Sequence, residues 1–163
     1  MLKWSILILI IAIFIGFRFF YVPYTVKNDW AWYEFEQLKV PSSPNFYLLC
    51  PEEQCKNVAE HGQSPVFHYG INKLKEKWGK MIAQQPRTHL LGTRQNQLAY
   101  VQYSAFWHFP DFIDVKFIQL GKDKSTLMIM SRSVFGHSDF GVNKKRVQSW
   151  VQALMNHNIS LLD

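Results

Sequence analysis

The segment from Ser131 to Arg146, SRSVFGHSDFGVNKKR, is the most distinctive in the chain, because it brings serine, histidine, aspartate and basic side chains together between glycines. Within it Ser138, His137 and Asp139 offer a nucleophile, a base and a carboxylate, which are the residue types of a serine hydrolase. A triad needs side chains that converge from different directions, which three sequence neighbours rarely do, and the chain has no G-x-S-x-G turn. We therefore keep these three residues as catalytic candidates and favour a structural role for the loop.

Four polar residues form a candidate anion-binding site at the start of the last helix: Arg132, Asp139, Asn143 and Arg146. Free backbone N–H groups at a helix N-terminus favour a bound anion. The alternative, which we favour, is that Asp139 and Asn143 cap the helix while Gly136 and Gly141 supply positive φ angles. In that case we expect Arg132 to pair with Asp139 and to hold the loop against the sheet.

The spacing of cysteines and histidines predicts neither a metal site nor a cofactor. Two cysteines are too few for a four-cysteine zinc or iron–sulfur centre, and no second Cys/His pair follows CPEEQC. No H-E-x-x-H or similar spacing is present. We expect the histidines outside the loop to be surface or hydrogen-bonded residues: His61, His68, His89, His108 and His157.

An apolar run at the N-terminus is long enough to cross a bilayer. It extends from Trp4 to Phe17 without a charge and, beyond Arg18, continues to Val22. At 1.5 Å per residue the run covers roughly 28 Å, close to the hydrocarbon thickness of a membrane. A cleaved signal peptide is the alternative, but no small-x-small cleavage site follows the run. We predict a retained single-pass transmembrane anchor over residues 1–22.

The numbers of positive charges on the two sides of the run are nearly equal, so they do not decide its orientation in the membrane. The amino terminus and Lys3 stand against Arg18 and Lys27. The two-residue leader favours an N-terminus inside, which predicts an inner-membrane protein with a periplasmic or other extracytoplasmic domain. Cys50 and Cys55 would then form a small disulfide in an oxidising compartment, the alternative being two reduced thiols.

The remaining chain divides into an aromatic-rich juxtamembrane connector, residues 23–45, and a soluble domain, residues 46–163. Apolar residues make up 48% of the chain and charged residues 18%, which excludes wholesale disorder. Within the connector, Asp29–Leu38 either forms a short helix on the membrane surface or packs onto the domain. We favour packing onto the domain.

An amphipathic helix is predicted over Ser64–Gln85. Ser64 suits the N-cap and Pro65 the first helical position, and Pro86 ends the helix because the residue before a proline avoids the α region. The helix carries one apolar stripe, made of Phe67, Ile71, Leu74, Trp78 and Ile82.

Strand signals follow in close succession. They cover Thr88–Thr93, Leu98–Trp107, the alternating residues around Val115, and Thr126–Phe135. Short connections predict an antiparallel meander. A last helix from about Asn143 has one apolar face, made of Val147, Trp150, Val151, Leu154 and Met155. We predict an α+β two-layer sandwich, with an antiparallel sheet of about four strands and an amphipathic helix before and after it.

The segment at residues 131–146 resembles the signature of the DUF1499 family, whose members carry a similar SR-x-x-G-x-SD-x-G-x-N-x-x-R run before a terminal helix. FIDVKF, residues 112–117, is similar to the family's Phe-x-Asp-Asp stretch and keeps Asp114, to which we assign a structural role. CPEEQC resembles the family's Cys-Pro element, although Lys56 to Ala59 stand where the family has serines. The resemblance covers about residues 46–157. It implies a domain found in bacteria and plastids, often behind a membrane or export segment, with no agreed activity.

Two functions remain open. The first is a membrane-anchored, non-catalytic envelope module that binds a partner protein or a small, apolar, lipid-like ligand. Aromatic residues that line a pocket or fill the core support it: Tyr100, Tyr103, Phe106 and Trp107. The second is a hydrolase-like enzyme that acts on an anionic envelope substrate through Arg132, His137 and Asp139. We exclude nucleic acid as a partner, because three basic residues that open an amphipathic helix, at 144–146, are usually its solvated side.

Overall fold

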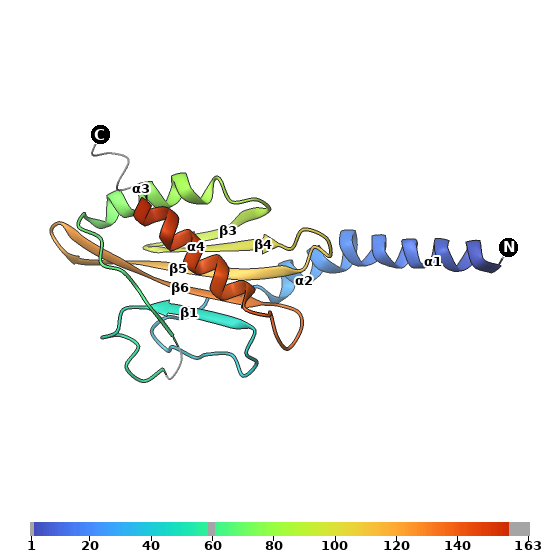
Figure 1. Cartoon of the computed structure of the whole chain (residues 1–163), viewed down its shortest axis with the longest axis horizontal. Coiled ribbons are helices and arrows are strands. Elements are labelled where there is room, and N and C mark those ends of the chain that lie inside the picture. Colours follow the sequence, from blue (N-terminus) through green and yellow to red (C-terminus); the bar gives the residue numbers. More distant parts are fainter. Residues whose placement is uncertain (1, 59–60, 157–163) are drawn as a thin grey trace.

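The computed structural model describes residues 2–58 and 61–156. The chain folds into an α+β domain with one apolar helix projecting from it (Figure 1). The domain is built on a mixed sheet of six strands, whereas the sequence predicted about four antiparallel strands.

The projecting helix is continuous but has three parts. α1 spans Leu2–Gly16, a wider π-helical segment η1 spans Phe17–Tyr21, and α2 spans Val22–Asp29. The 27 residues from Lys3 to Asp29 are long and apolar enough to cross a membrane, a property that a signal sequence shares. α1 extends away from the domain, whereas three residues of α2 are buried: Val22, Thr25 and Val26.

The strands lie in the order β2-β1-β6-β5-β4-β3. Their bounds are β1 Phe46–Cys50, β2 Gly62–Gln63, β3 Thr88–Arg94, β4 Gln97–Tyr103, β5 Pro110–Gly121 and β6 Lys124–Ser133. The last four form the predicted antiparallel meander. β1 adds to it antiparallel to β6, and β2 pairs with β1 in parallel. The sequence did not signal β1 because the strand is short and apolar throughout, so it shows no alternation.

The first domain helix, α3, spans Ile71–Ile82, so the prediction that it begins at Ser64 is wrong. The residues before it are extended along β6: Phe67 exchanges backbone hydrogen bonds with Ser125, and the Ser64 hydroxyl donates to the Leu127 carbonyl. Phe67 is nevertheless buried in the core. It therefore has to be apolar, and its spacing from Ile71 matches a helical stripe although it lies before the helix.

Helices α3 and α4 cover one face of the sheet. α4 spans Val142–Asn156, close to the predicted start. Trp78 of α3 and Trp150 of α4 meet edge to face, with ring centroids 5.9 Å apart, above a core of β-strand side chains. Burial of these large aromatic rings fixes both helices on the sheet.

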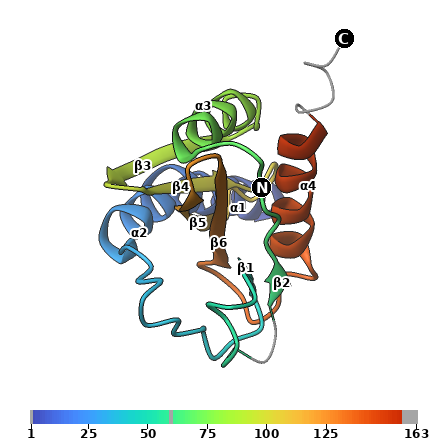
Figure 2. The same ribbon diagram turned by 90° about the vertical axis from the view of Figure 1, so that its left-hand side faces the viewer.

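The opposite face is covered by α2 and by residues 30–40 (Figure 2). Asp29–Leu38 forms no surface helix: residues 30–34 have no regular structure and residues 35–38 form a turn. Tyr33 and Phe35 are buried against β1 and β6, beside Leu48, Met128 and Met130. The connector therefore packs onto the domain.

Candidate functional site

The loop after β6 and the start of α4 rest on a fully buried asparagine. Asn143 has no exposed surface. Its Nδ2 donates to the Asn45 carbonyl and to Ser133 Oγ, both at 3.0 Å, and its Oδ1 accepts from Ser131 Oγ at 2.6 Å. Because both polar atoms of the amide are partnered inside the protein, the side chain fastens α4 to β1 and β6 and is not free to bind a ligand.

Arg146, one turn further along α4, extends the same network. Its Nη1 donates to Asn143 Oδ1 at 2.6 Å and to Ser131 Oγ at 2.9 Å. Its Nη2 forms an ion pair with Asp111, and its Nε donates to Gln102. The Arg146 and Asp111 side chains are only 8% and 13% exposed. The positive charge of Arg146 is therefore neutralised within the protein, which argues against its use by an external anion.

Asp139 holds the beginning of α4. Its carboxylate accepts hydrogen bonds from the backbone N–H groups of Asn143 at 2.7 Å and Gly141 at 3.1 Å. Gly136 and Gly141 have φ angles of 86° and 79°, which side chains with a Cβ rarely adopt. Both carboxylate oxygens are thus committed to a helix cap.

Arg132 pairs with Asp114 rather than with Asp139, so the predicted pairing is wrong. Arg132 Nη1 lies 2.7 Å from an oxygen of Asp114, and Nη2 donates to the Ala31 carbonyl at 2.9 Å. The other Asp114 oxygen accepts from the Tyr33 backbone N–H at 3.2 Å and from Gln97 Nε2 at 3.3 Å. Asp114 is fully buried, and this burial raises the pKa of its carboxyl despite the opposing effect of Arg132.

The predicted pair of Arg132 with Asp139 does not form because successive side chains of a strand point to opposite faces of the sheet. Ser131 of β6 faces α4, so the next side chain, Arg132, projects from the opposite face toward residues 30–34. The loop that carries Asp139 returns to the α4 face. The four anion-site candidates are therefore divided between two faces of the sheet and do not form one site.

The hydrolase candidates are not assembled for catalysis. His137 and Ser138 are exposed, and Ser138 Oγ accepts a hydrogen bond from the Phe140 backbone N–H at 3.3 Å. Within the described residues no hydrogen bond joins His137 to Ser138 or Asp139. Because Asp139 is already used as a cap, the loop lacks the oriented base that a serine nucleophile requires.

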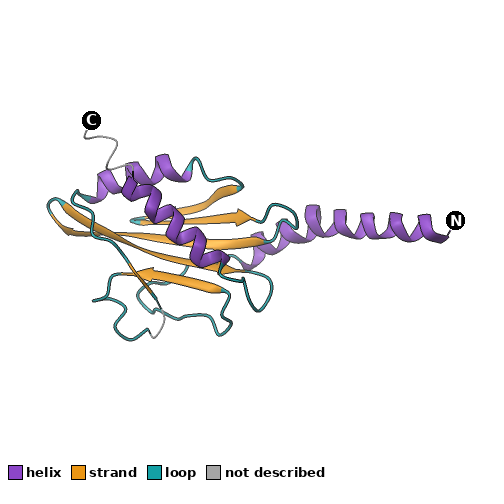
Figure 3. Ribbon diagram, in the orientation of Figure 1, coloured by secondary structure: helices purple, strands orange, loops and turns teal. Residues whose placement is uncertain are grey.

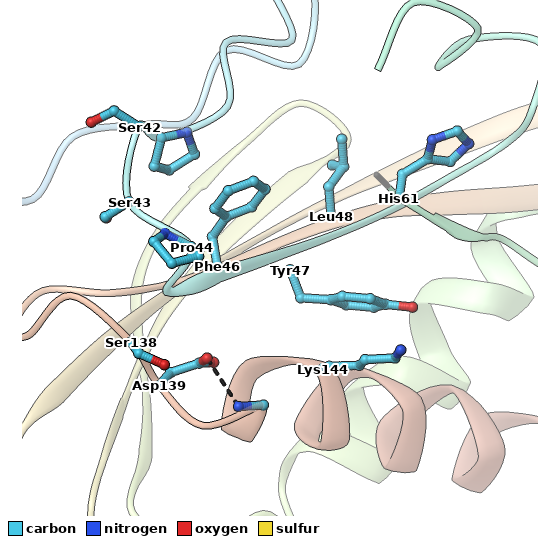
Figure 4. A pocket seen from close by; sticks show the side chains of 12 residues that line it. Ser42, Ser43, Pro44, Phe46, Tyr47, Leu48, His61, Ser138, Asp139 and Lys144 are labelled. Carbon is cyan, nitrogen blue, oxygen red and sulfur yellow. Dashed lines mark hydrogen bonds between the residues drawn. The ribbon is translucent and has the colours of Figure 1, made fainter. Parts of the chain in front are cut away.

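A groove lies beside this loop, along the outer side of β1 (Figure 4). It has a volume of about 860 Å³ and is bounded by residues 41–44, by β1 and by the start of α4. Tyr47 and Lys144 lie close to each other across it, Ser138 and Asp139 stand at one end, and His61 stands at the other. Long loops flank β1 on both sides in sequence (Figure 3), so this edge of the sheet is shaped by loops and not by a further long strand.

A disulfide joins Cys50, the last residue of β1, to Cys55 in the turn that follows. Their Cα atoms are 6.3 Å apart, and both residues are fully buried. The bond closes the turn that ends β1 and packs against Tyr33 and Phe35 of the connector. The two cysteines do not line the groove, and the bond leaves neither of them as a reactive thiol.

The aromatic candidates separate into core and surface residues. Tyr100 is buried and accepts a hydrogen bond from Trp78 Nε1 at 3.0 Å. Tyr103 stacks on His108 with ring centroids 4.5 Å apart. Phe106 and Trp107 are 68% and 50% exposed, so they do not fill the core.

Among residues 2–58 and 61–156 no three His, Cys, Asp or Glu side chains gather in a way that could hold a metal ion. His61 Nδ1 donates to the Val58 carbonyl at 3.0 Å, and the His89 ring lies against that of Tyr103. His157 lies outside the described residues.

Sequence reasoning missed several members of these networks, namely Asn45, Gln97, Gln102 and Asp111. One signal was available: Asp114 stands among apolar strand residues, and a buried carboxylate requires a cationic or hydrogen-bonding partner. Its partner Arg132 is 18 residues away, and only the register of β5 against β6 brings the two together.

A family model described as a protein of unknown function, DUF1499, matches residues 50–154 of the chain. The match includes β2 to β6, α3, nearly all of α4 and the disulfide. Three members of the polar networks, Ala31, Tyr33 and Asn45, precede it. No curated protein matches the chain.

Proposed function

The chain belongs to the DUF1499 family, whose description names no activity, and from the structure we propose that it is a membrane-anchored, non-catalytic binding module of the cell envelope. Its ligand is an extended peptide segment of a partner protein, bound along the open edge of β1. The observation that carries the proposal is the unpaired backbone of this edge within the groove.

The apolar N-terminal helix supports anchoring. Between Lys3 and Lys27 its only charge is Arg18, and Trp4 and Tyr21 stand near the two ends of the run as interfacial aromatic residues do. In this proposal the N-terminus lies inside and the domain lies on the extracytoplasmic side of the inner membrane. The Cys50–Cys55 disulfide suits that oxidising side.

The edge of β1 supports peptide binding. Ser133 N–H donates to the Asn45 carbonyl, so Asn45, Tyr47 and Leu49 direct their backbone groups toward β6. The N–H and C=O groups of Phe46 therefore face outward. β2 pairs only with Leu49 and Cys50, and in the described part of the chain no strand pairs with Phe46 on this side. An extended peptide that adds to a sheet edge binds through such groups.

The groove gives this edge the shape of a binding site. Its rim offers the Lys144 ammonium group and the Ser138 hydroxyl, and its walls include the prolines Pro41 and Pro44. Exposed strand edges are normally protected by charges, prolines or covering loops. Here the loops stand beside the edge and leave an open channel along it, which suits a guest strand. The hydrolase alternative has no comparable support, because among the described residues no hydrogen bond joins His137 to Ser138 or Asp139 and the Asp139 carboxylate caps α4.

Substitution of Phe46 by proline tests the proposal. Proline removes the outward N–H group and leaves the hydrogen bonds between β1 and β6 in place. Phe46→Ala is the matched control, because it loses the same side chain and keeps the N–H group. A photo-crosslinking amino acid at Lys144 of the full chain, expressed in its native envelope, reports on the groove, and the same amino acid at Lys73 on exposed α3 is the position control.

We expect a discrete adduct from position 144 but not from position 73. The adduct should persist in the Phe46→Ala background and fall at least about tenfold with Phe46→Pro. Equal adducts in both backgrounds would show that β1 does not pair with the ligand. The absence of a position-specific adduct would refute the groove as a binding site.

A further inference from the structure

An aromatic loop joins β4 to β5 at the end of the sheet from which α1 departs (Figure 1). We define the aromatic loop as residues 104–109. Its rings contact the apolar helix: Phe106 and Trp107 lie with their ring centroids 6.0 and 5.8 Å from that of Phe14, and Phe109 lies 5.9 Å from Phe17. The rings nevertheless remain exposed, by 68% for Phe106, 50% for Trp107 and 38% for Phe109. Three exposed aromatic rings side by side form an apolar patch of the kind that marks an interaction site for a membrane or a partner.

A second groove lies between this loop and the helix. Its volume is about 680 Å³, and every side chain that lines it is apolar. Ile10, Phe14 and Phe17 form the helix side, whereas the aromatic loop and Phe135 form the domain side. The surface of the groove is almost entirely apolar, so it suits an apolar ligand and not a polar one.

The length of the helix places this groove relative to a bilayer. Ring contacts with the domain begin at Phe14, so the uncharged stretch between Lys3 and these contacts is Trp4 to Ile13. Ten residues at 1.5 Å each cover about 15 Å, well short of a hydrocarbon layer of about 30 Å. A membrane-spanning helix must therefore include the residues up to about Tyr21. Phe14 then lies about 10 Å inside the outer boundary of the hydrocarbon, and the rings that touch it lie at a similar depth.

We propose that the aromatic loop is embedded in the outer half of the bilayer and that the groove beside the helix holds the acyl chain of a bilayer lipid. This inference rests on the proposed membrane anchor. The occupant is a lipid because the groove is continuous with the apolar surface of the helix itself, which lipid surrounds. The loop thereby gives the domain a second attachment to the membrane and restrains its rotation about the anchor.

The closure of the loop agrees with immersion in the bilayer. Backbone groups in hydrocarbon need partners within the protein. Ser104 N–H donates to the Phe109 carbonyl, and Phe109 N–H donates to Ser104 Oγ, both at 2.9 Å. Arg18 Nη1 donates to the Phe106 carbonyl at 2.9 Å, which gives the one charge within the apolar run a partner on this loop.

Depth measurement by spin labels tests the proposal in the full chain reconstituted in vesicles of phosphatidylethanolamine and phosphatidylglycerol. A nitroxide is attached through Trp107→Cys, with the Cys50–Cys55 disulfide left intact. Two control labels are Ile8→Cys, within the proposed span, and Leu90→Cys, on β3 and 57% exposed. Collisions with oxygen, which concentrates in hydrocarbon, are compared with collisions with a water-soluble nickel chelate.

We expect the label at position 107 to resemble that at position 8, with oxygen collisions dominant, and the label at position 90 to show the reverse. A water-exposed label at 107 with a lipid-exposed label at 8 would overturn the inference and leave the anchor intact. A water-exposed label at 8 would overturn both the anchor and this inference.

A photo-crosslinking amino acid at Phe106, in the same vesicles, identifies the occupant of the groove. An adduct with the mass of a phospholipid is expected. An adduct with a second copy of the chain, or the absence of any lipid adduct, would overturn the assignment of the groove.

Discussion

Replacement of Arg132 by methionine removes the cation that stands beside a fully buried carboxylate. The Asp114 side chain is 0% exposed and that of Arg132 is 19% exposed, so solvent screens the pair weakly. Two unit charges about 4 Å apart interact by about 4 kcal/mol at an effective dielectric constant of 20. Removal of one partner from a buried pair typically costs about 3–5 kcal/mol. We expect a loss of stability of that size and a melting temperature lowered by roughly 10 °C or more.

The pH dependence of this variant has a definite sign. Burial already raises the pKa of Asp114, and loss of the Arg132 guanidinium raises that pKa further. A carboxyl with a higher pKa in the folded state binds more protons when folded, so the stability of the variant falls as pH rises from about 4 through the raised folded pKa. The difference between variant and wild type is therefore smallest in acid and largest at neutral pH.

Thermal unfolding of the full chain in detergent micelles, followed by near-ultraviolet circular dichroism in acid and at neutral pH, measures both effects. The matched control is Arg94→Met, which breaks an exposed pair with Glu34 whose side chains are 37% and 44% exposed. We expect that control to cost about 1 kcal/mol or less. A melting temperature of Arg132→Met within the range of the control, or a deficit that grows in acid, would refute the reasoning. Asp139→Ala should add to Arg132→Met independently, because the two side chains lie on opposite faces of the sheet.

Three further predictions concern the loop, the helices and the disulfide. Asn143→Ala should lower the melting temperature clearly, because the partners of a fully buried amide lose hydrogen bonds worth about 1–3 kcal/mol per unsatisfied group, and an unchanged melting curve would contradict the network. Gly141→Ala should destabilise the protein by about 1–2 kcal/mol, because alanine is strained at the positive φ of this position. Gly79→Ala, within α3 and with open space around it, should stabilise the protein by about 0.5–1 kcal/mol. Changes of the same sign in the two variants would contradict this explanation. Protein from its native compartment, alkylated without reduction and weighed by mass spectrometry, should carry no label on Cys50 or Cys55, and labelling of both would show that the disulfide is absent there.

Sequence patterns predicted the parts of the fold that depend on local periodicity. The meander β3 to β6 and α4 follow from alternation, short turns and a 3.6-residue apolar repeat. The start of α3 was wrong because Ser64 and Pro65 are good helix openers that tertiary contacts hold in extended form: Thr126 Oγ1 donates to the Pro65 carbonyl at 2.8 Å. Strand β1 escaped prediction because both of its faces are covered.

The polar networks were harder to predict than the strands that carry them. The sequence drew attention to residues 131–146, but side chains of this segment are partnered across as many as 101 positions of sequence, as between Arg132 and Ala31. Charge complementarity suggested a nearby partner for Arg132 in Asp139, although alternation along β6 points the two apart. Pairings of this kind depend on register, which local sequence does not encode.

The neighbouring residues Ser131 and Arg132 have a consequence for how β6 finds its place. The four residues before them, Leu127 to Met130, are all apolar and all buried, so their hydrophobicity is the same after a shift of one position. Such a shift would place the guanidinium under α4 beside Asn143 and would leave Asp114 facing a hydroxyl or an apolar side chain. Ser131 and Arg132 thus distinguish between registers of β6 that the apolar residues 127–130 would allow equally. A shifted register would be destabilised on both faces of the sheet at once.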